Sequence, residues 1–409
     1  MAEARTYNQR RRSGQNSPEE VRRPVRRRYA LWEQLDLSLI LNLLIIMGFG
    51  LLMVYSASSY SALRMFSEQA HFFKRQLLWD VVGLVLGLVV VFVPYGIYKK
   101  FALVIYLISL ASIFLVIPFG NESHGASRWV VIPGTKLQFQ PSEIVKIAII
   151  LFVAFMINRL GESVNTLQGM ALVFVPTLPA MALIFGLTSH LSSALIVLGI
   201  TIMMLFISCR DYKFFLGVFI LLGLIAAGVC AYVASSDLSE GNYRFGRIVA
   251  WLYPELSTDE TAHQILNSLY AIGNGGFWGK GLGQSVQKIS ALPEPHNDFI
   301  FAIICEELGA FGAIVLVLLY VLLLFQMYRV ARRTKDRFGF LLVVGVMAHI
   351  AIQVVLHIAV NTNSMPNTGV SLPFVSYGGS SAVLLIVEMG LVLSVQRQNV
   401  ISESDYETK

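Results

Sequence analysis

Ten apolar segments, each about the length of a membrane-spanning helix, constrain this 409-residue chain more than any other feature. About 20 helical residues cross the hydrocarbon core of a bilayer. The segments run Leu37–Tyr55, Leu77–Val93, Phe101–Phe119, Ser142–Ile157, Met170–Leu187, Leu191–Ile207, Phe214–Ala234, Phe299–Gln326, Phe338–Val360 and Ser381–Val395. Hydrophobic residues form 56% of the chain and charged residues 14%, and the mean hydropathy is +0.66, more than a soluble domain buries. The sequence predicts an all-α polytopic membrane protein with about ten transmembrane helices.

Basic residues outside these segments predict the orientation. Residues 1–28 hold nine Arg and three Glu, and this balance of +6 equals the formal net charge of the whole chain. The other basic groups that fall on the same side are Lys99, Lys100, Arg159, Arg210, Lys213, Arg329, Arg332, Arg333, Lys335 and Arg337. Cytoplasmic loops are enriched in Lys and Arg. We therefore expect both termini in the cytoplasm and interpret the basic tail as a topogenic segment, with no nucleic acid as partner.

The chain then divides into three parts. We expect a disordered basic tail over residues 1–35, a ten-helix membrane domain over 36–396, and a cytoplasmic C-terminal tail over 397–409. Three long loops face outward: Ser56–Gln76, Gly120–Pro141 and Ser235–Asn297. The third, residues 235–297, is a large extracytoplasmic loop between helices seven and eight. Cys209, Cys230 and Cys305 lack ligand-like spacing, so they are interpreted as small core residues.

The third loop carries helical and glycine-rich signals. Ser257–Glu260 has capping-box spacing before the helical pattern Ile265, Leu266, Leu269, Ile272. A glycine-rich stretch, Gly273–Gly283, follows; it is not a P-loop, because Gly281 rather than Ser or Thr comes after Lys280. We expect short surface helices on the outer leaflet, with Phe277 and Trp278 at the headgroup level.

Asp298 lies where this loop enters an apolar run. The polar segment Leu292–Asp298 leads directly into Phe299–Ile304. A carboxylate carried to the bilayer centre costs roughly 2.5–3.5 kcal/mol, so an acid at this boundary is a candidate functional residue. Burial should raise its pKa and the helix N-terminus should lower it, and the sequence leaves the balance open.

Polar groups from other stretches fall at the same outer level. They are Arg75 and Gln76, Ser142, Glu143 and Lys146, His357, and Ser376 to Ser380. Together with Asp298 they could line one cavity. Glu143 and Lys146 share a helix face, and two roles stay open for them: a structural ion pair, or a cation near a pyrophosphate.

Further ionisable groups are expected deeper in the membrane. Glu306 and Glu307 follow Asp298 by eight and nine residues, which is roughly 12–14 Å along a helix. Glu388 and His349 are expected at similar depth. Such groups form buried pairs that fix helix packing, or they line a transport path.

Three stretches resemble signatures of the SEDS family (FtsW, RodA and SpoVE). They are Gly125–Trp129 with Phe139–Glu143 and Lys146, Ser268–Gly273 continuing through Gly283–Ser285 to Asp298–Phe301, and Leu372–Ser381. The resemblance covers nearly the whole chain. It implies a peptidoglycan glycosyltransferase of the bacterial cytoplasmic membrane that polymerises lipid II at the outer face, in division, shape or sporulation. It also implies a class B penicillin-binding protein as partner and undecaprenyl-pyrophosphate-linked glycan as the growing strand.

By position, the resemblance implies that Asp298 is the catalytic general base. The residues expected to bind substrate around it are Arg75, Arg128, Gln140, Ser142, Glu143, Lys146, Lys280, Gln284, Lys288, Glu294, His296, Ser376 and Tyr377. No cofactor is certain. A divalent ion such as Mg²⁺ or Mn²⁺, with Asp298 as a ligand, is a possibility that the residues leave open.

The chain departs from the family pattern at three places. Asn297 replaces the usual Thr, Thr188–Ala194 replaces a Gln-Pro-Asp-Leu-Gly-Thr-Ala-like run, and Asn363–Gly369 lacks a Lys that some members carry. An acid's role in the second stretch is therefore lost or moved. The long basic tail is more similar to the division-type (FtsW-like) branch. Two alternatives remain: a lipid II flippase that depends on the deeper acids, and a non-catalytic activator of a partner synthase.

Overall fold

The computed structural model describes residues 34–123, 126–131, 134, 138–210, 212–235, 243–255, 260–290 and 292–407. The expected disordered tail lies almost entirely outside these residues, as does the expected capping box before Glu260. The described residues contain ten helices long and apolar enough to cross a membrane, which confirms the expected fold class.

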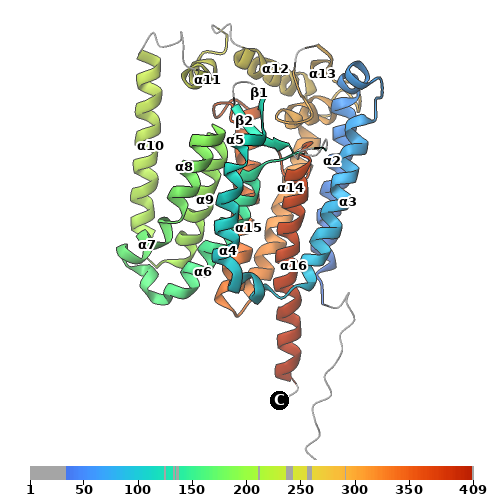
Figure 1. Ribbon diagram of the computed structural model, residues 1–409. Helices are drawn as coiled ribbons and strands as arrows, with labels where there is room; N and C mark the ends of the chain where they lie inside the picture. The colour runs from blue at the N-terminus through green and yellow to red at the C-terminus, as the bar shows by residue number, and fades with distance from the viewer. Residues whose placement is uncertain are drawn as a thin grey trace, which may run out of the picture.

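These spans form an upright helical bundle (Figure 1). They are α2 (Leu37–Phe66), α3 (His71–Phe92), α4 (Tyr95–Phe114) with the short α5 (Val116–Phe119), α6 (Pro141–Leu160) with the 3₁₀ turn η2 (Gly161–Asn165), α7 (Leu167–Phe174) with α8 (Thr177–Thr188), α9 (Leu191–Ser208), α10 (Tyr212–Ser235), α14 (Ile300–Arg333), α15 (Arg337–Asn361) and α16 (Ser380–Glu407). Pro176 interrupts the fifth span between α7 and α8, where a proline removes a helical hydrogen bond.

The centre of the bundle is built on α6, α15 and α16, which bury most of their residues. Helix α3 packs along α16 so closely that a Cβ on Gly390 would lie 2.6 Å from the carbonyl oxygen of Gly87. Small residues at such crossings let helix backbones approach in a membrane, where packing drives association. By contrast, α10 stands at the edge of the bundle with nearly all its surface exposed (Figure 1).

A small antiparallel sheet occupies the second outward loop, where the sequence analysis predicted only a loop. Strands β1 (Gly120–Ser123), β2 (Ala126–Val131) and β3 (Gln138–Phe139) pair in that order. The sheet leads directly into α6: Gln140 is the N-cap residue and Pro141 takes the first helical position, where its missing N–H costs nothing. The sheet therefore fixes where the outer end of α6 begins.

The outer end of the bundle is covered by three short helices. These are α11 (Tyr243–Leu252), α12 (Glu260–Gly275) and α13 (Gln287–Ser290), and they lie at the end opposite the C-terminus (Figure 1). The expected helical pattern from Ile265 to Ile272 falls inside α12. Phe277 and Trp278 are exposed, and Trp278 lies against Phe311 with ring centroids 5.5 Å apart.

Helix α14, which contains the expected span Phe299–Gln326, is broken near its N-terminal end. Gly309 has φ +70° and ψ −172°, which is not helical. The glycine-rich stretch fills the break through four main-chain hydrogen bonds: Lys280 N to Glu306 O, Gly281 N to Glu307 O, Ala310 N to Gly276 O and Phe311 N to Phe277 O. A Cβ at Gly309 would lie 2.3 Å from the Phe277 carbonyl oxygen, so only glycine fits.

Candidate functional site

Asp298 lies two residues before α14, and another residue caps that helix. The side chain of Asn361, the last residue of α15, donates from Nδ2 to the Asp298 carbonyl oxygen at 2.9 Å. Its Oδ1 accepts from the Ala302 N–H at 3.1 Å. Asn361 therefore accepts a hydrogen bond from the first turn of α14, and the Asp298 carboxylate is not used as the cap of that helix.

The Asp298 carboxylate faces the loop before α16. A Cβ at Gly369 would lie 3.3 Å from its Oδ2 atom. Burial raises the pKa of Asp298 to about 6, with a further rise from Glu294, while Arg128 and Arg247 lower it. Burial therefore outweighs the opposing charges of the two arginines. The part of the chain that the structure describes gives this carboxylate no hydrogen bond.

The segment before Asp298 is tied to the loop that precedes α16. Ser376 Oγ donates to the Asn297 carbonyl oxygen at 2.8 Å, and Tyr377 N–H donates to the His296 carbonyl oxygen at 3.0 Å. Phe72 of α3 packs against both rings, with its centroid 4.3 Å from His296 and 5.2 Å from Tyr377. Three elements distant in sequence thus meet beside the candidate base.

The entry of α3 belongs to the same region. Gln76 Oε1 accepts from the Gly378 N–H at 3.2 Å, and its Nε2 donates to Asp80 at 2.9 Å. Burial raises the pKa of Tyr377, and the charge of Arg75 opposes that rise. Arg75 and Gln76 therefore lie against the loop that holds Ser376 and Tyr377, as the sequence analysis expected of one outer level.

A second polar group gathers around His190, between α8 and α9. Gln140 Nε2 lies 3.0 Å from His190 Nδ1, and Ser193 Oγ lies 2.7 Å from the same atom. Arg128 and Arg247 both lower the pKa of His190, as they do that of Asp298. The two arginines therefore lie within electrostatic reach of both groups.

Glu143 and Lys146 form a buried ion pair at 2.7 Å. Ser381 Oγ of α16 also donates to Glu143 at 3.0 Å. Next to them, His349 Nδ1 lies 2.8 Å from Glu388 Oε2 and joins α15 to α16. Of the two roles left open for Glu143 and Lys146, the structure shows the ion pair. His349 and Glu388 form the expected buried packing pair.

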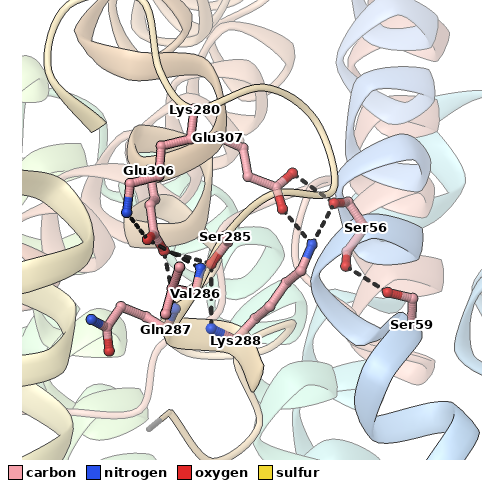
Figure 2. Close-up of polar contacts among 9 residues, drawn as sticks. All are labelled: Ser56, Ser59, Lys280, Ser285, Val286, Gln287, Lys288, Glu306 and Glu307. Carbon is pink, nitrogen blue, oxygen red and sulfur yellow. Dashed lines mark hydrogen bonds and ion pairs between the residues drawn. The ribbon is translucent and has the colours of Figure 1, made fainter. Parts of the chain in front are cut away.

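Glu306 and Glu307 both pair with lysines of the expected extracytoplasmic loop (Figure 2). Lys280 binds Glu306 at 2.9 Å and Lys288 binds Glu307 at 2.6 Å. Both lysines belong to the outer loop. The two acids lie in the first segment of α14, before the break at Gly309, and their ion pairs place them beside that loop.

Figure 2 shows how completely these acids are bonded. Ser285 Oγ donates to Glu306 at 2.5 Å, and the Val286 and Gln287 N–H groups add bonds of 3.2 and 3.3 Å. Ser56 of α2 donates to Glu307 at 2.6 Å. The network fastens the first segment of α14 to the loop and to α2.

Of the remaining expected substrate-binding residues, two are exposed and one is buried. Gln284 is exposed. Glu294 is exposed as well and accepts from Asn297 Nδ2 at 2.8 Å. Ser142 is buried in the first turn of α6, beside Glu143.

Residues 36–401 match the FtsW/RodA/SpoVE family of cell cycle proteins. The chain belongs to this family. It is 37% identical over 365 residues to a protein of Trichlorobacter lovleyi named probable peptidoglycan glycosyltransferase FtsW, covering 88% of this chain and 92% of that one. It is 36% identical over 368 residues to stage V sporulation protein E of Bacillus subtilis, covering 88% and 97%.

Solved structures agree with this membership of the FtsW/RodA/SpoVE family. A chain from a structure titled "Structural coordination of polymerization and crosslinking by a peptidoglycan synthase complex" superposes with a TM-score of 0.72 at 26% identity, covering 89% of this chain and 98% of that one. The rod shape determining protein RodA of Thermus thermophilus gives a TM-score of 0.66 at 26% identity, covering 90% and 98%. The resemblance found in the sequence is therefore confirmed.

The described residues of this FtsW/RodA/SpoVE family member offer few ligands for a divalent ion. Within the described ranges, no three His, Cys, Asp or Glu side chains gather as a metal site. The charged side chains that act on Asp298 are Arg128, Arg247 and the exposed Glu294. Two cations and one further carboxylate do not fit a dedicated binding site for a divalent cation.

Sequence reasoning missed three residues of this site. Arg247 comes from α11 and donates to the Asn367 carbonyl oxygen at 3.3 Å, which puts it above the loop that touches Asp298. Asn361 ends an apolar helix, and His190 sits between two others. The only signal for them was a polar residue at the edge of an apolar run, and many surface residues share it.

Proposed function

We propose that this chain polymerises lipid II at the outer face of the bacterial cytoplasmic membrane, with Asp298 as the general base. Its place in the FtsW/RodA/SpoVE family and its relatives named peptidoglycan glycosyltransferase support the enzyme class. The observation that carries the assignment of Asp298 is its carboxylate: it lies among buried groups with its pKa raised to about 6, and it is spared from capping α14. A base whose pKa lies near the working pH is suited to proton transfer.

The reaction joins two lipid-linked sugars. The 4-hydroxyl of the incoming lipid II attacks the anomeric carbon of the strand, and the new C–O bond replaces the bond to undecaprenyl pyrophosphate. Asp298 takes the hydroxyl proton as that bond forms. The pyrophosphate leaves with the electron pair of the broken bond, and attack from the opposite face inverts the anomeric centre to the β configuration.

Positive charge near Asp298 suits the leaving group. Arg128 and Arg247 act electrostatically on Asp298, and fixed cations stabilise the charge that develops on a departing pyrophosphate. The expected contributions of Arg75, Gln140, Ser142, Ser376 and Tyr377 to substrate binding stay part of this proposal. Lys146, Lys280 and Lys288 each form an ion pair with a buried glutamate, so we assign them to stabilising the shape of the site and not to binding substrate.

Partner and topology complete the proposal. A class B penicillin-binding protein would cross-link the strands, and one similar solved structure is titled as a peptidoglycan synthase complex. Both termini lie in the cytoplasm, because the basic residues gather on that side. The domain bounds remain residues 1–35, 36–396 and 397–409.

A flippase is the weaker candidate. It requires a chain of ionisable groups through the membrane, yet Glu306 and Glu307 lie beside the outer loop. The deep acid that remains, Glu388, is paired with His349. The non-catalytic activator differs from our proposal in one measurable respect: it needs no carboxylate at position 298.

Polymerisation of purified lipid II tests the proposal. The purified protein with its partner synthase should yield glycan strands, and Asp298→Asn should reduce the yield at least about 100-fold, the scale of a lost general base. Glu162→Gln, which alters an exposed acid of η2, serves as the control for handling and folding. Equal product from wild type and Asp298→Asn would remove Asp298 as the base and favour an activator role.

A further inference from the structure

His190 is a buried histidine whose hydrogen bonds determine where its proton sits. It is 8% exposed, and its Nδ1 atom is approached by Gln140 Nε2 at 3.0 Å and by Ser193 Oγ at 2.7 Å. An amide nitrogen has no acceptor capacity, so Nδ1 must accept. The ring proton therefore lies on Nε2, and His190 presents one fixed N–H donor.

That donor has no partner in the part of the chain that the structure describes. Nε2 of His190 is buried and makes no hydrogen bond with the residues that the structure describes. A buried, unsatisfied N–H costs free energy and calls for a function. Burial, together with the charge of Arg128, lowers the pKa of His190 to about 3, so the ring stays neutral at physiological pH and keeps a single donor.

His190 is connected to Asp298 through the loop before α16. Ser192, two residues on, donates to the carbonyl oxygen of Thr368, and the next residue, Gly369, borders the Asp298 carboxylate. Arg128 and Arg247 act electrostatically on both His190 and Asp298. A neutral donor within electrostatic reach of two guanidinium groups, with no acceptor left on its own ring, matches a ligand that offers negatively charged oxygen atoms.

We infer that His190 is a substrate-contact residue that donates from Nε2 to a pyrophosphate oxygen of a lipid-linked sugar. The choice of pyrophosphate lipid rests on the proposed function. Gln140 and Ser193 act as positioning residues, because they hold the ring in the tautomer that donates. Two lipids in the reaction carry this group, the growing strand and the incoming lipid II.

Direct binding of undecaprenyl pyrophosphate in nanodiscs tests the inference without relying on catalysis. His190→Asn keeps an acceptor for Gln140 and Ser193 but ends short of the Nε2 position. A hydrogen bond to a charged group is worth roughly a 10- to 100-fold change in affinity, so Kd should rise by about that factor. His190→Gln carries an N–H donor out to the Nε2 position, and its Kd should stay within about 5-fold of wild type. Binding of undecaprenol, which lacks the charged group, should not change.

Thr201→Val is the matched control. Thr201 lies on α9, like Ser193, and its hydroxyl is bonded to Thr177 at 3.0 Å, so the variant loses a buried hydrogen bond outside the pocket. Its Kd should equal that of wild type. The inference is overturned if His190→Asn binds as wild type does, if His190→Gln loses as much affinity as His190→Asn, or if Thr201→Val loses it equally.

Polymerisation kinetics then separate the two lipids. A rise in KM for lipid II in His190→Asn assigns the contact to the incoming lipid, and a fall in kcat assigns it to the leaving group; either result supports the inference. Asp298→Asn should retain full pyrophosphate binding. If wild type binds the lipid through His190 but makes no glycan, the proposed function fails while this inference stands.

Discussion

At the scale of single residues, the site depends on the division of labour between Asn361 and Asp298. An acid beside a helix N-terminus usually stabilises that helix by accepting from its free N–H groups. Here Asn361 of α15 bonds both the Ala302 N–H and the Asp298 carbonyl oxygen. The carboxylate is left for proton transfer, with its pKa raised to about 6 by burial.

The rate of polymerisation should follow the titration of Asp298. The base must be deprotonated, so activity should rise with pH through about 6 and level off above it. Arg128 lowers this pKa, so Arg128→Met should move the midpoint to higher pH. Glu294 raises the pKa of Asp298, so Glu294→Gln should move the midpoint to lower pH. Initial rates between pH 5 and 8.5, taken as roughly the range around that pKa, measure both. If the midpoint is the same in both variants as in wild type, the titration belongs to another group.

The contribution of Asp298 to the free energy of unfolding should fall with pH, whereas the rate of polymerisation should rise. Because the folded pKa of Asp298 lies above its usual value of 3.8, the native state holds the proton that the unfolded chain releases. This carboxyl therefore lowers the free energy of unfolding as pH rises from about 3.8 to about 6. Asp298→Asn removes that cost. Its unfolding midpoint in detergent should exceed that of wild type at pH 7.5 and match it near pH 4, values set roughly by those two pKa limits. A lower midpoint at pH 7.5 would contradict this account.

At the scale of elements, the broken helix α14 positions the site. Its first segment starts directly after Asp298 and ends at Gly309, where the glycine-rich stretch bonds both halves. The ion pairs of Glu306 and Glu307 hold the same segment from the side (Figure 2). Sequence patterns could not predict this arrangement. The apolar run continues through Gly309, and the break is stabilised by main-chain bonds from residues about 30 positions earlier.

Removing one partner of the buried pair Lys288–Glu307 should be costly. Lys288→Met leaves the Glu307 carboxylate buried with Ser56 alone, and losing one partner of a buried pair costs about 3–5 kcal/mol of unfolding free energy. The double variant Lys288→Met/Glu307→Gln removes the stranded charge and should recover most of the loss. Urea or thermal unfolding in detergent measures both.

The exposed pair Lys74–Glu68 is the comparison for that experiment. Its side chains are 66% and 44% exposed, and an ion pair in water contributes little. Lys74→Met should leave the unfolding midpoint unchanged. If Lys74→Met and Lys288→Met destabilise equally, the cost comes from a change in net charge and not from burial.

At the scale of the whole molecule, the sequence predicts what depends on local composition. Ten spans follow from hydropathy alone, and the acid at the edge of an apolar run marks Asp298. It does not predict Arg247, whose role depends on α11 folding over the loop that touches Asp298. Nor does it predict that Glu306 and Glu307 pair with Lys280 and Lys288, because these ion pairs depend on how the loop folds against α14. The family signatures identify the loops, but they do not predict which loops contact one another, because those contacts form only in the folded chain.

Orientation is the property of the whole molecule on which the proposed chemistry depends, because Asp298 can meet lipid II only if its end of the bundle faces outward. Gln284 is exposed in the loop above Asp298, and Arg332 is exposed at the far end of α14. In a chain whose Cys209, Cys230 and Cys305 are replaced by Ala, Gln284→Cys should react with a membrane-impermeant maleimide in intact cells. Arg332→Cys should react only after permeabilisation, since the basic cluster around it belongs on the cytoplasmic side. The reverse pattern would place Asp298 in the cytoplasm, and a polymerase working on the outer leaflet would be untenable.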